Sequence, residues 1–465
     1  MKLKILNNLF TGIMSNTPNN KQSSNLSDIP YIDQLKEKSD ILAKYGGFDL
    51  LESAIDDVQN LNPDRKARRK MFLTENNKKQ EREALLKTLE LWSETLKSGD
   101  DIIDQVQMAE DNSKESEQVL TKNLKIGLEE TRELESSYRS VALFFKNTDQ
   151  ASIKNVSIVN AELEQLADLD NTRFFDYVRE ELVSKYDRLD LRDNYSLMVV
   201  PGYLGTKSVV DKWAKLAHEN KVTLVTDFAH LDEPDDVMEM FESANLASGD
   251  AYLSNTIMTC NWLVGRGKFE EAGEEEDLFV PPSGALAGKI YKTLMSQVTA
   301  GKKHGGLSEV DGVCFDLKKS EISNLENLGL VPMVNEYGKV MAFSAKTLFN
   351  GDNLGLQTYS VVRVFDYVAK VLMDFLNRRA FENFNAKTRK EIQNQVVRFL
   401  DDITGPDKLI ENFEVRRFEQ DPNQKDRIYL DVRLKPYFPA KNFLIKMDGQ
   451  KGDEGTEWDT DYEQQ

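Results

Sequence analysis

Few residues in this 465-residue sequence have the types and spacing that enzyme chemistry requires. Of the three histidines, His218, His230 and His304, only His230 follows directly after a predicted strand, where α/β proteins place functional groups. A hydrolase would need this imidazole beside a serine or cysteine and oriented by a carboxylate. The sequence has no Gly-x-Ser-x-Gly elbow, Cys-x-x-Cys pair or His-Glu-x-x-His helix. We therefore predict no catalytic residue. His230 is the one histidine whose position suits a functional role.

The segment Gly284–Ile290 reads Gly-Ala-Leu-Ala-Gly-Lys-Ile and invites comparison with a phosphate-binding loop. Its spacing is one residue short of that pattern, and Ile290 stands where a metal-binding Ser or Thr is needed. Two prolines precede it in place of a buried strand. We predict a loop that enters a close-packed helix, and no cofactor.

No metal site is expected either. The two cysteines, Cys260 and Cys314, are isolated, so they form neither a disulfide framework nor a metal-binding spacing, and both lie in apolar stretches typical of a core. The acidic run Glu270–Asp277 has the composition of an exposed loop. A reducing cytoplasm suits this cysteine usage.

Charge and hydropathy exclude further classes of function. The formal net charge is −19, whereas binding a nucleic-acid backbone requires clustered Lys and Arg. No run of eighteen apolar residues occurs, and the N-terminus lacks the apolar segment and cleavage site of a signal peptide. We expect a cytoplasmic protein that neither enters a membrane nor binds nucleic acid.

The pattern along the chain changes four times and predicts five regions. They are an N-terminal arm and flexible linker (1–30), a helical region (31–150), an α/β core (151–410), C-terminal strands (411–447) and an acidic disordered tail (448–465). In the core, apolar runs at 156–159, 197–200 and 222–226 alternate with helical patterns. Continuous apolar strands of this kind indicate a sheet covered by helices on both faces. The predicted fold class is mixed α/β.

Apolar residues gather at both ends of the chain. In the N-terminal arm, Leu3, Leu6 and Phe10 recur at helical spacing, whereas Leu3 and Ile5 equally suit a strand. An apolar arm on a polar linker cannot fold alone, so we expect it to dock on another surface.

Near the C-terminus two or three late strands are predicted, over 413–418, 428–434 and 443–447. Such strands leave an edge with unpaired backbone groups, which is covered internally or paired with another chain. The side chains expected to carry this sheet are Ile428, Leu430, Val432, Leu434, Phe443, Ile445 and Met447.

Four segments in fixed order resemble a known family. They read Leu-Glu-Ser-Ser-Tyr-Arg-Ser (134–140), Leu-Gly-Leu-Val-Pro-Met-Val (328–334), Ala-Phe-Ser-Ala-Lys-Thr (342–347) and Leu-Lys-Pro-Tyr-Phe (434–438). They resemble Leu-Glu-Ala-Ser-Trp-Arg-Gly, Leu-Gly-Phe-Ile-Pro-Leu-Val, Phe-Gly-Ala-Gln-Ser and Leu-Arg-Pro-His-Phe of the TssC/VipB family, the large contractile-sheath subunits of type VI secretion systems. The family's Arg-Leu-Pro-Tyr-Gly segment is diverged here at 261–267. This divergence, a shortened middle and the acidic loop resemble the Bacteroidetes-type branch.

The resemblance implies a structural protein and no enzyme. Members of this family pair with a small sheath subunit (TssB/VipA) and form a helical sheath with copies of themselves around an inner tube of Hcp. The sheath docks on a baseplate at the inner membrane, contracts to propel tube and spike outward, and is disassembled by the AAA+ ATPase ClpV. C-terminal strands of one subunit and an N-terminal strand of another share a sheet, which suits both chain ends described above. The arm is also a candidate ATPase handle.

The resemblance also implies an inner-tube contact on a helix that precedes the C-terminal strands. The helical pattern over 388–403 has mixed charge, and we select Arg389, Lys390, Arg398 and Asp401 as the candidate contact. An ordinary amphipathic surface helix explains the same residues. Two alternatives for the whole chain remain: a sheath protein of a phage tail or extracellular contractile injection system, or an α/β ligand-binding enzyme with its site near His230.

Overall fold

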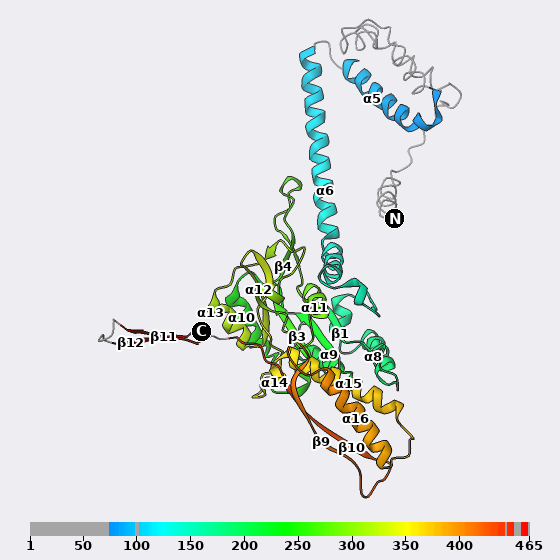
Figure 1. Ribbon diagram of the computed structural model, residues 1–465. Helices are drawn as coiled ribbons and strands as arrows, with labels where there is room; N and C mark the ends of the chain where they lie inside the picture. Colours follow the sequence, from blue (N-terminus) through cyan, green and yellow to red (C-terminus); the bar gives the residue numbers. More distant parts are fainter. Residues whose placement is uncertain (1–73, 98–101, 442–443, 451–456, 464–465) are drawn as a thin grey trace, which may run out of the picture. The chain divides into compact units, whose positions relative to one another are not determined.

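The computed structural model describes residues 74–97, 102–441, 444–450 and 457–463 (Figure 1). The chain divides into two compact units between Lys122 and Asn123. The N-terminal arm with Leu3, Ile5, Leu6 and Phe10, its linker, and Phe443 lie outside the described residues. Within the described residues, no helix combines the length and apolar character needed to cross a membrane.

The described part of the N-terminal region is helical, as predicted. It consists of the 3-10 turn η2 (Asn76–Lys78), the helix α5 (Lys79–Lys97) and the 46-residue helix α6 (Ile102–Asn147). From Asn123 onward α6 belongs to the second unit. Its last turns pack on the α/β core through Leu143, which is buried, and Phe144.

The core is a five-stranded sheet in the order β1-β2-β3-β7-β8. The strands are β1 (Leu197–Tyr203), β2 (Thr223–Asp227), β3 (Thr256–Cys260), β7 (Leu330–Glu336) and β8 (Lys339–Ala342). The first four are parallel and β8 is antiparallel to β7. All five side chains of β2 and of β3 are buried, so both faces of these strands are covered.

Helices cover both faces of this sheet, which confirms the predicted fold class. Alternate residues of β2 point to opposite faces, so Leu224 packs in one apolar cluster and Val225 in another. The first cluster contains residues of α8 (Arg173–Tyr186), α9 (Lys207–Glu219), α10 (Pro234–Ala244) and α13 (Lys319–Asn327). The second contains residues of α6 and of α11 (Ser283–Lys292).

A second sheet and several short helices complete the core. The small antiparallel sheet has the order β5-β4-β6, with β4 (Leu263–Arg266), β5 (Leu278–Val280) and β6 (Gly312–Val313). The short helices are α7 (Leu163–Ala167), α12 (Gly301–His304) and α14 (Leu354–Gln357), with 3-10 turns η3 (Gln150–Ser152), η4 (Ala251–Asn255) and η5 (Glu270–Ala272).

The strand predicted at 156–159 is wrong. These residues form no strand, and Val156, Ile158 and Val159 are exposed. An apolar run forms a strand only where another strand pairs with its backbone groups, and no strand of the described part pairs with these residues. The C-terminal region follows the core with α15 (Tyr359–Arg378), α16 (Ala386–Asp402), β9 (Ile410–Gln420), β10 (Ile428–Pro436), β11 (Leu444–Gln450) and β12 (Glu457–Glu463).

The buried carboxylate of Asp227, at the end of β2, connects four elements. It accepts hydrogen bonds from the backbone N–H of Gly202 (2.8 Å) and Ser283 (2.7 Å), and from the hydroxyls of Thr259 (2.5 Å) and Ser283 (2.6 Å). It thereby joins β1 and β3 to the N-terminus of α11. Burial raises the pKa of Asp227 to about 6, against the effect of these four donors.

The segment from Gly284 to Ile290 lies in the close-packed helix that was predicted, but it is helical throughout and not a loop, and its glycines face α6. A Cβ atom on Gly284 would lie 2.4 Å from the backbone oxygen of Ser140. One on Gly288 would lie 2.3 Å from that of Phe144. Two glycines four residues apart therefore let the backbones of α11 and α6 approach closely, and this packing accounts for the pattern that suggested a phosphate loop.

The close contact between α11 and α6 predicts how much stability is lost when a methyl group is added at Gly288. Gly288→Ala should lower the free energy of unfolding by about 1–3 kcal/mol, because the added Cβ must push α6 away from α11. The measurement is urea unfolding followed by tryptophan fluorescence.

The matched control is Gly127→Ala, on the exposed side of α6, where a Cβ atom would meet nothing within 4 Å. Alanine is the better helix former, so this variant should be neutral or stabilised by up to about 1 kcal/mol. Equal stability of Gly288→Ala and the wild type would contradict the packing account.

Candidate inter-subunit surface

The C-terminal layer is built around the antiparallel pair β9–β10. The pairing runs from Ile428 opposite Gln420 to Pro436 opposite Ile410, with irregularities after Asp431 and after Lys435. In the connecting turn, Asp421 accepts hydrogen bonds from the backbone N–H of Asn423 (2.8 Å) and from the hydroxyl of Tyr429 (2.7 Å). The turn between these strands is therefore ordered by an aspartate that bonds to its own loop.

One face of this pair packs on helices. Leu430, Val432 and Leu434 alternate along β10 and join the apolar cluster that also holds residues of α15 and α16. The buried members of that cluster are Val364, Val368, Ile392, Val396, Leu400, Ile410 and Phe418. The shared face predicted for Leu430, Val432 and Leu434 is therefore present, while Ile428, at the start of the strand, is 41% exposed.

The other face of β9–β10 is charged. Lys435 pairs with Glu411 at 2.7 Å and Arg416 with Glu414 at 3.3 Å, and Arg417 lies over the ring of Tyr429 with 4.1 Å to its centroid. Exposed pairs of this kind add little stability, but a charged face disfavours stacking against an apolar surface. Another protein surface that adds to this sheet would therefore use its edges and not its charged face.

Both edges of β9–β10 lack a partner strand among the described residues. The sheet has two strands, and the one additional pairing is an isolated bridge between Thr404 and Ile410 at the base of β9. Unpaired N–H and C=O groups on a strand edge are a template for a further strand. The first of the two predicted alternatives, an edge covered within the chain, does not occur in the described part.

A second antiparallel pair, β11–β12, follows. Ile445 lies opposite Tyr462 and Met447 opposite Thr460. The prediction of a disordered tail over 448–465 is wrong for β12 (Glu457–Glu463). There Trp458, Thr460 and Tyr462 alternate with acidic residues, a period-2 pattern with strand-favouring residue types that the high charge of the segment conceals.

The helix α16 presents the four charged candidates outward. Arg389, Lys390, Arg398 and Asp401 are exposed, whereas Ile392, Val396 and Leu400 form the buried stripe. The side chain of Asn385 caps the helix by accepting from the backbone N–H groups of Lys387 and Thr388 at 3.0 Å each. The arrangement suits a contact on the charged face, and it equally suits an amphipathic surface helix.

The helix α15 fixes this layer to the core. At its start the hydroxyl of Tyr359 accepts from the backbone N–H of Thr299 at 2.9 Å. Further along, the ammonium of Lys370 donates to the carbonyls of Tyr195 (3.1 Å) and Lys221 (2.8 Å), and burial lowers the pKa of Lys370 to about 8. Contacts at both halves of α15 hold the C-terminal layer against the core.

The helix α6 carries an apolar stripe that faces solvent. Tyr138 is 72% exposed and Leu134 is 70% exposed, and Leu124 and Val141 are exposed beside them. The inward face consists instead of Ser136, Arg139 and Ser140, whose small or polar side chains contact the backbone of the core.

The acidic run 270–277 is only partly the exposed loop that was predicted. The side chain of Glu274 is 8% exposed and bonds to Arg266 (2.6 Å) and to Arg132 of α6 (2.7 Å). Arg266 also forms a bond of 2.9 Å to Glu135 of α6. The hydrogen bond from Arg266 lowers the pKa of Glu274. We call the ion pairs of Arg266 with Glu135 and Glu274 the Arg266 clamp. The sequence analysis did not predict it, because Arg266 and Glu135 lie far apart in the chain.

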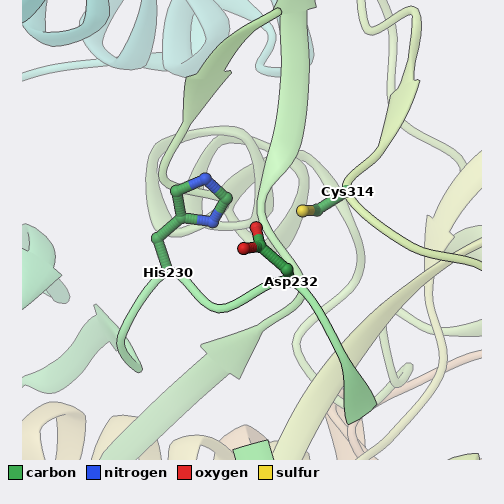
Figure 2. Close-up of side chains that lie close together, drawn as sticks. All are labelled: His230, Asp232 and Cys314. Carbon is green, nitrogen blue, oxygen red and sulfur yellow. The ribbon is translucent and has the colours of Figure 1, made fainter. Parts of the chain in front are cut away.

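The structure brings His230 together with two residues that the sequence did not connect to it. Asp232 and Cys314 lie beside it, and the imidazole, carboxylate and sulfur ligand atoms are all within 4.8 Å of one another (Figure 2). Burial lowers the pKa of His230 and raises the pKa of Cys314 to about 11. The sulfur is therefore a protonated thiol and not an activated nucleophile. Cys260 is a buried core residue, as predicted.

Comparison with known proteins identifies the family. Models of the TssC/VipB family match residues 35–124 (N-terminal region), 126–350 (central domain of type VI secretion system TssC/VipB) and 358–464 (C-terminal domain). A comparison with curated proteins gave no match. The three models together extend over nearly the whole chain, so the chain belongs to the TssC/VipB family and is a contractile sheath subunit.

Solved structures give weaker likenesses. The contracted helical sheath of the anti-feeding prophage matches with a TM-score of 0.48 and 15% identity, over 66% of this chain and 80% of that one. The contracted PVC sheath of an extracellular contractile injection system matches with a TM-score of 0.43 and 15% identity, over 66% of this chain and 100% of that one. A sheath tail protein from Desulfitobacterium hafniense matches with a TM-score of 0.38 and 12% identity, over 64% of this chain and 60% of that one. The family assignment rests on the family models.

The Arg266 clamp predicts how the acidic loop responds to protease. Arg266→Lys cannot reproduce the multiple N–H contacts to both Glu135 and Glu274, because an ammonium lacks the planar fork of a guanidinium. The loop should then detach from α6, and cleavage by a glutamate-specific protease within 270–276 should become several-fold faster. Lys268→Arg is the control, since Lys268 and its partner Glu270 are both exposed. Equal cleavage rates in Arg266→Lys and the wild type would contradict this role of the clamp.

Proposed function

We propose that this chain is the large subunit of a type VI secretion sheath and assembles through strand addition at the β9–β10 edges. The observation that carries the proposal is a two-stranded sheet with one face on helices, one charged face and both edges without a partner strand in the described part. Such a sheet accepts further strands through main-chain hydrogen bonds. The strands we propose to be added come from copies of this chain and from a small sheath subunit (TssB/VipA).

The N-terminal arm is the proposed donor. Leu3, Ile5, Leu6 and Phe10 form an apolar segment on a polar linker, and a segment of this kind can reach and pair with the edge of a neighbouring subunit. Main-chain pairing along an edge tolerates rotation of the subunits that it joins. Contraction would then be a change of lattice in which the subunits move as rigid bodies and remain stitched together.

The apolar stripe of α6 is the proposed contact for the small sheath subunit. Exposed apolar side chains at helical spacing, such as Leu134 and Tyr138, mark protein–protein contacts more often than isolated surface residues do. An amphipathic helix of the small subunit could bury them by ridge-into-groove packing. The contact lies on the opposite side of α6 from Ser140 and does not disturb the packing on α11.

Family membership supports the remaining proposed partners. The charged face of α16, with Arg389, Lys390, Arg398 and Asp401, is the proposed releasable contact with the Hcp inner tube. The sheath would dock on a baseplate and store conformational energy in its extended lattice. Disassembly would be driven by the AAA+ ATPase ClpV, and this chain itself would hydrolyse no nucleotide. We place the assembly in the cytoplasm.

Removal of β11 and β12 tests whether the C-terminal strands join subunits to one another. A chain ending at Lys441 keeps Leu430, Val432 and Leu434 on the helices, whereas a deletion beginning at 431 would also expose that apolar face. We expect the shortened chain to fold with an unchanged unfolding midpoint. Co-expressed with the small subunit, it should yield no tubes by electron microscopy, because we propose that β11 and β12 also join the sheet shared between subunits.

The control is Asp431→Asn with Arg433→Gln, on the charged face of β10, which leaves the backbone edges intact and should still give tubes. Tubes formed by the chain that ends at Lys441 would contradict the part of the proposal that concerns β11 and β12.

Charge on the α6 stripe tests the small-subunit contact. The double variant Leu134→Arg/Tyr138→Arg should bind the small subunit at least about tenfold more weakly in a co-purification titration, since buried aromatic and apolar anchors dominate such contacts. Its unfolding midpoint should not change, because both side chains are exposed. Glu130→Gln/Glu133→Gln on the same helix raises the net charge by the same amount and is the charge-matched control. Wild-type binding by the stripe variant would place the small subunit elsewhere.

A further inference from the structure

Three residues from two loops bring metal-binding atoms together at the end of the core sheet. His230 and Asp232 follow β2, and Cys314 follows β6. Figure 2 shows their side chains gathered at this point, and their nitrogen, oxygen and sulfur ligand atoms all lie within 4.8 Å of one another. Imidazole, carboxylate and thiolate are the three ligand types that zinc sites in proteins combine.

The side chain of Trp262 and its backbone hold this cluster in place. The indole stacks on the imidazole of His230, with ring centroids 5.2 Å apart and 18° between the planes. Its Nε1–H donates to the carbonyl of Phe228 (2.9 Å), at the start of the loop that carries His230 and Asp232. The carbonyl of Trp262 accepts from the backbone N–H of Cys314 at 2.9 Å. One residue therefore positions both loops, as supporting residues of metal sites do.

The electrostatic surroundings favour a cation. Asp232 acts electrostatically on both His230 and Cys314, and Glu276 of the acidic run does so as well. Arg132 opposes them at His230. A divalent ion would be balanced by the Asp232 carboxylate and by the thiolate that forms when Cys314 releases its proton to solvent.

We propose that His230, Asp232 and Cys314 bind one Zn²⁺ ion, with the fourth coordination position left to water. In a tetrahedral site with bonds of 2.0–2.3 Å, the ligand atoms stand roughly 3.3–3.7 Å apart. The present ligand atoms lie within 4.8 Å of one another, so small movements of the three side chains would bring them to these separations. The site shares no residues with the strand edges or the α6 stripe. An experiment that disproves metal binding therefore leaves the proposed sheath function untouched, and the reverse also holds.

Cobalt substitution tests the site on the full-length chain without a histidine tag. Co²⁺ should bind with one equivalent and produce a thiolate-to-metal charge-transfer band together with visible bands of tetrahedral cobalt, and Zn²⁺ should displace it. Cys314→Ser should abolish the charge-transfer band. His230→Ala and Asp232→Asn should each weaken binding at least about tenfold.

His304→Ala is the matched control, because His304 is half-buried and lies outside the cluster; it should bind as the wild type does. The unfolding midpoint of each apo variant, measured in parallel, shows that the fold is retained. Absence of a charge-transfer band in the wild type would overturn the proposal. So would binding that survives all three substitutions at the cluster, which would mark adventitious metal on the acidic surface.

Discussion

The carboxylate of Asp227 lies where the ends of three parallel strands meet the beginning of a helix, and the placement of the other surfaces depends on it. Its four hydrogen bonds orient α11 against the sheet, so that Gly284 and Gly288 face α6. The closeness of that approach leaves no room for a methyl group on either glycine. A buried carboxylate carries a desolvation cost, and here it is offset by donors from two neighbouring strands and a helix.

Because α6 is fixed in this way, its two sides have different tasks. The inward side uses Ser136, Arg139 and Ser140, which suit close backbone contact and hydrogen bonds. Leu134 and Tyr138 are thereby turned outward, where they are costly unless a partner covers them. The Arg266 clamp adds a second attachment between α6 and the acidic loop, and this attachment keeps Glu274 out of solvent.

The C-terminal layer shows the same division between what is buried and what is left open. α15 fixes it to the core through Tyr359 and Lys370, and the cluster beneath β9–β10 buries one face of the sheet. Charge occupies the other face. The main-chain groups along the edges are the part of this layer that no described strand satisfies, and they are the surface at which we propose that neighbouring subunits join.

The sequence by itself determined the class of fold, the family and most elements, because hydrophobic periodicity reports local burial. The alternation of Leu430, Val432 and Leu434 predicted a strand with one buried face, and the run at 222–226 predicted a strand buried on both. The same reasoning failed at 156–159 and at β12, where the presence or absence of a pairing strand decided the outcome. Whether the charged candidates on α16 touch a partner stays a prediction.

Only the tertiary structure decided which distant residues meet. The glycines at 284 and 288 excluded a phosphate loop by their spacing, yet the helix they approach could not be read from them. Nothing in the sequence distinguishes Arg266 and Glu135 from other charged residues, and only the fold brings them together as an ion pair. His230, Asp232 and Cys314 carry no metal-binding spacing, because the cluster forms between loops of two different sheets. Periodicity encodes which side of an element is buried, whereas contacts between elements depend on how the whole chain packs.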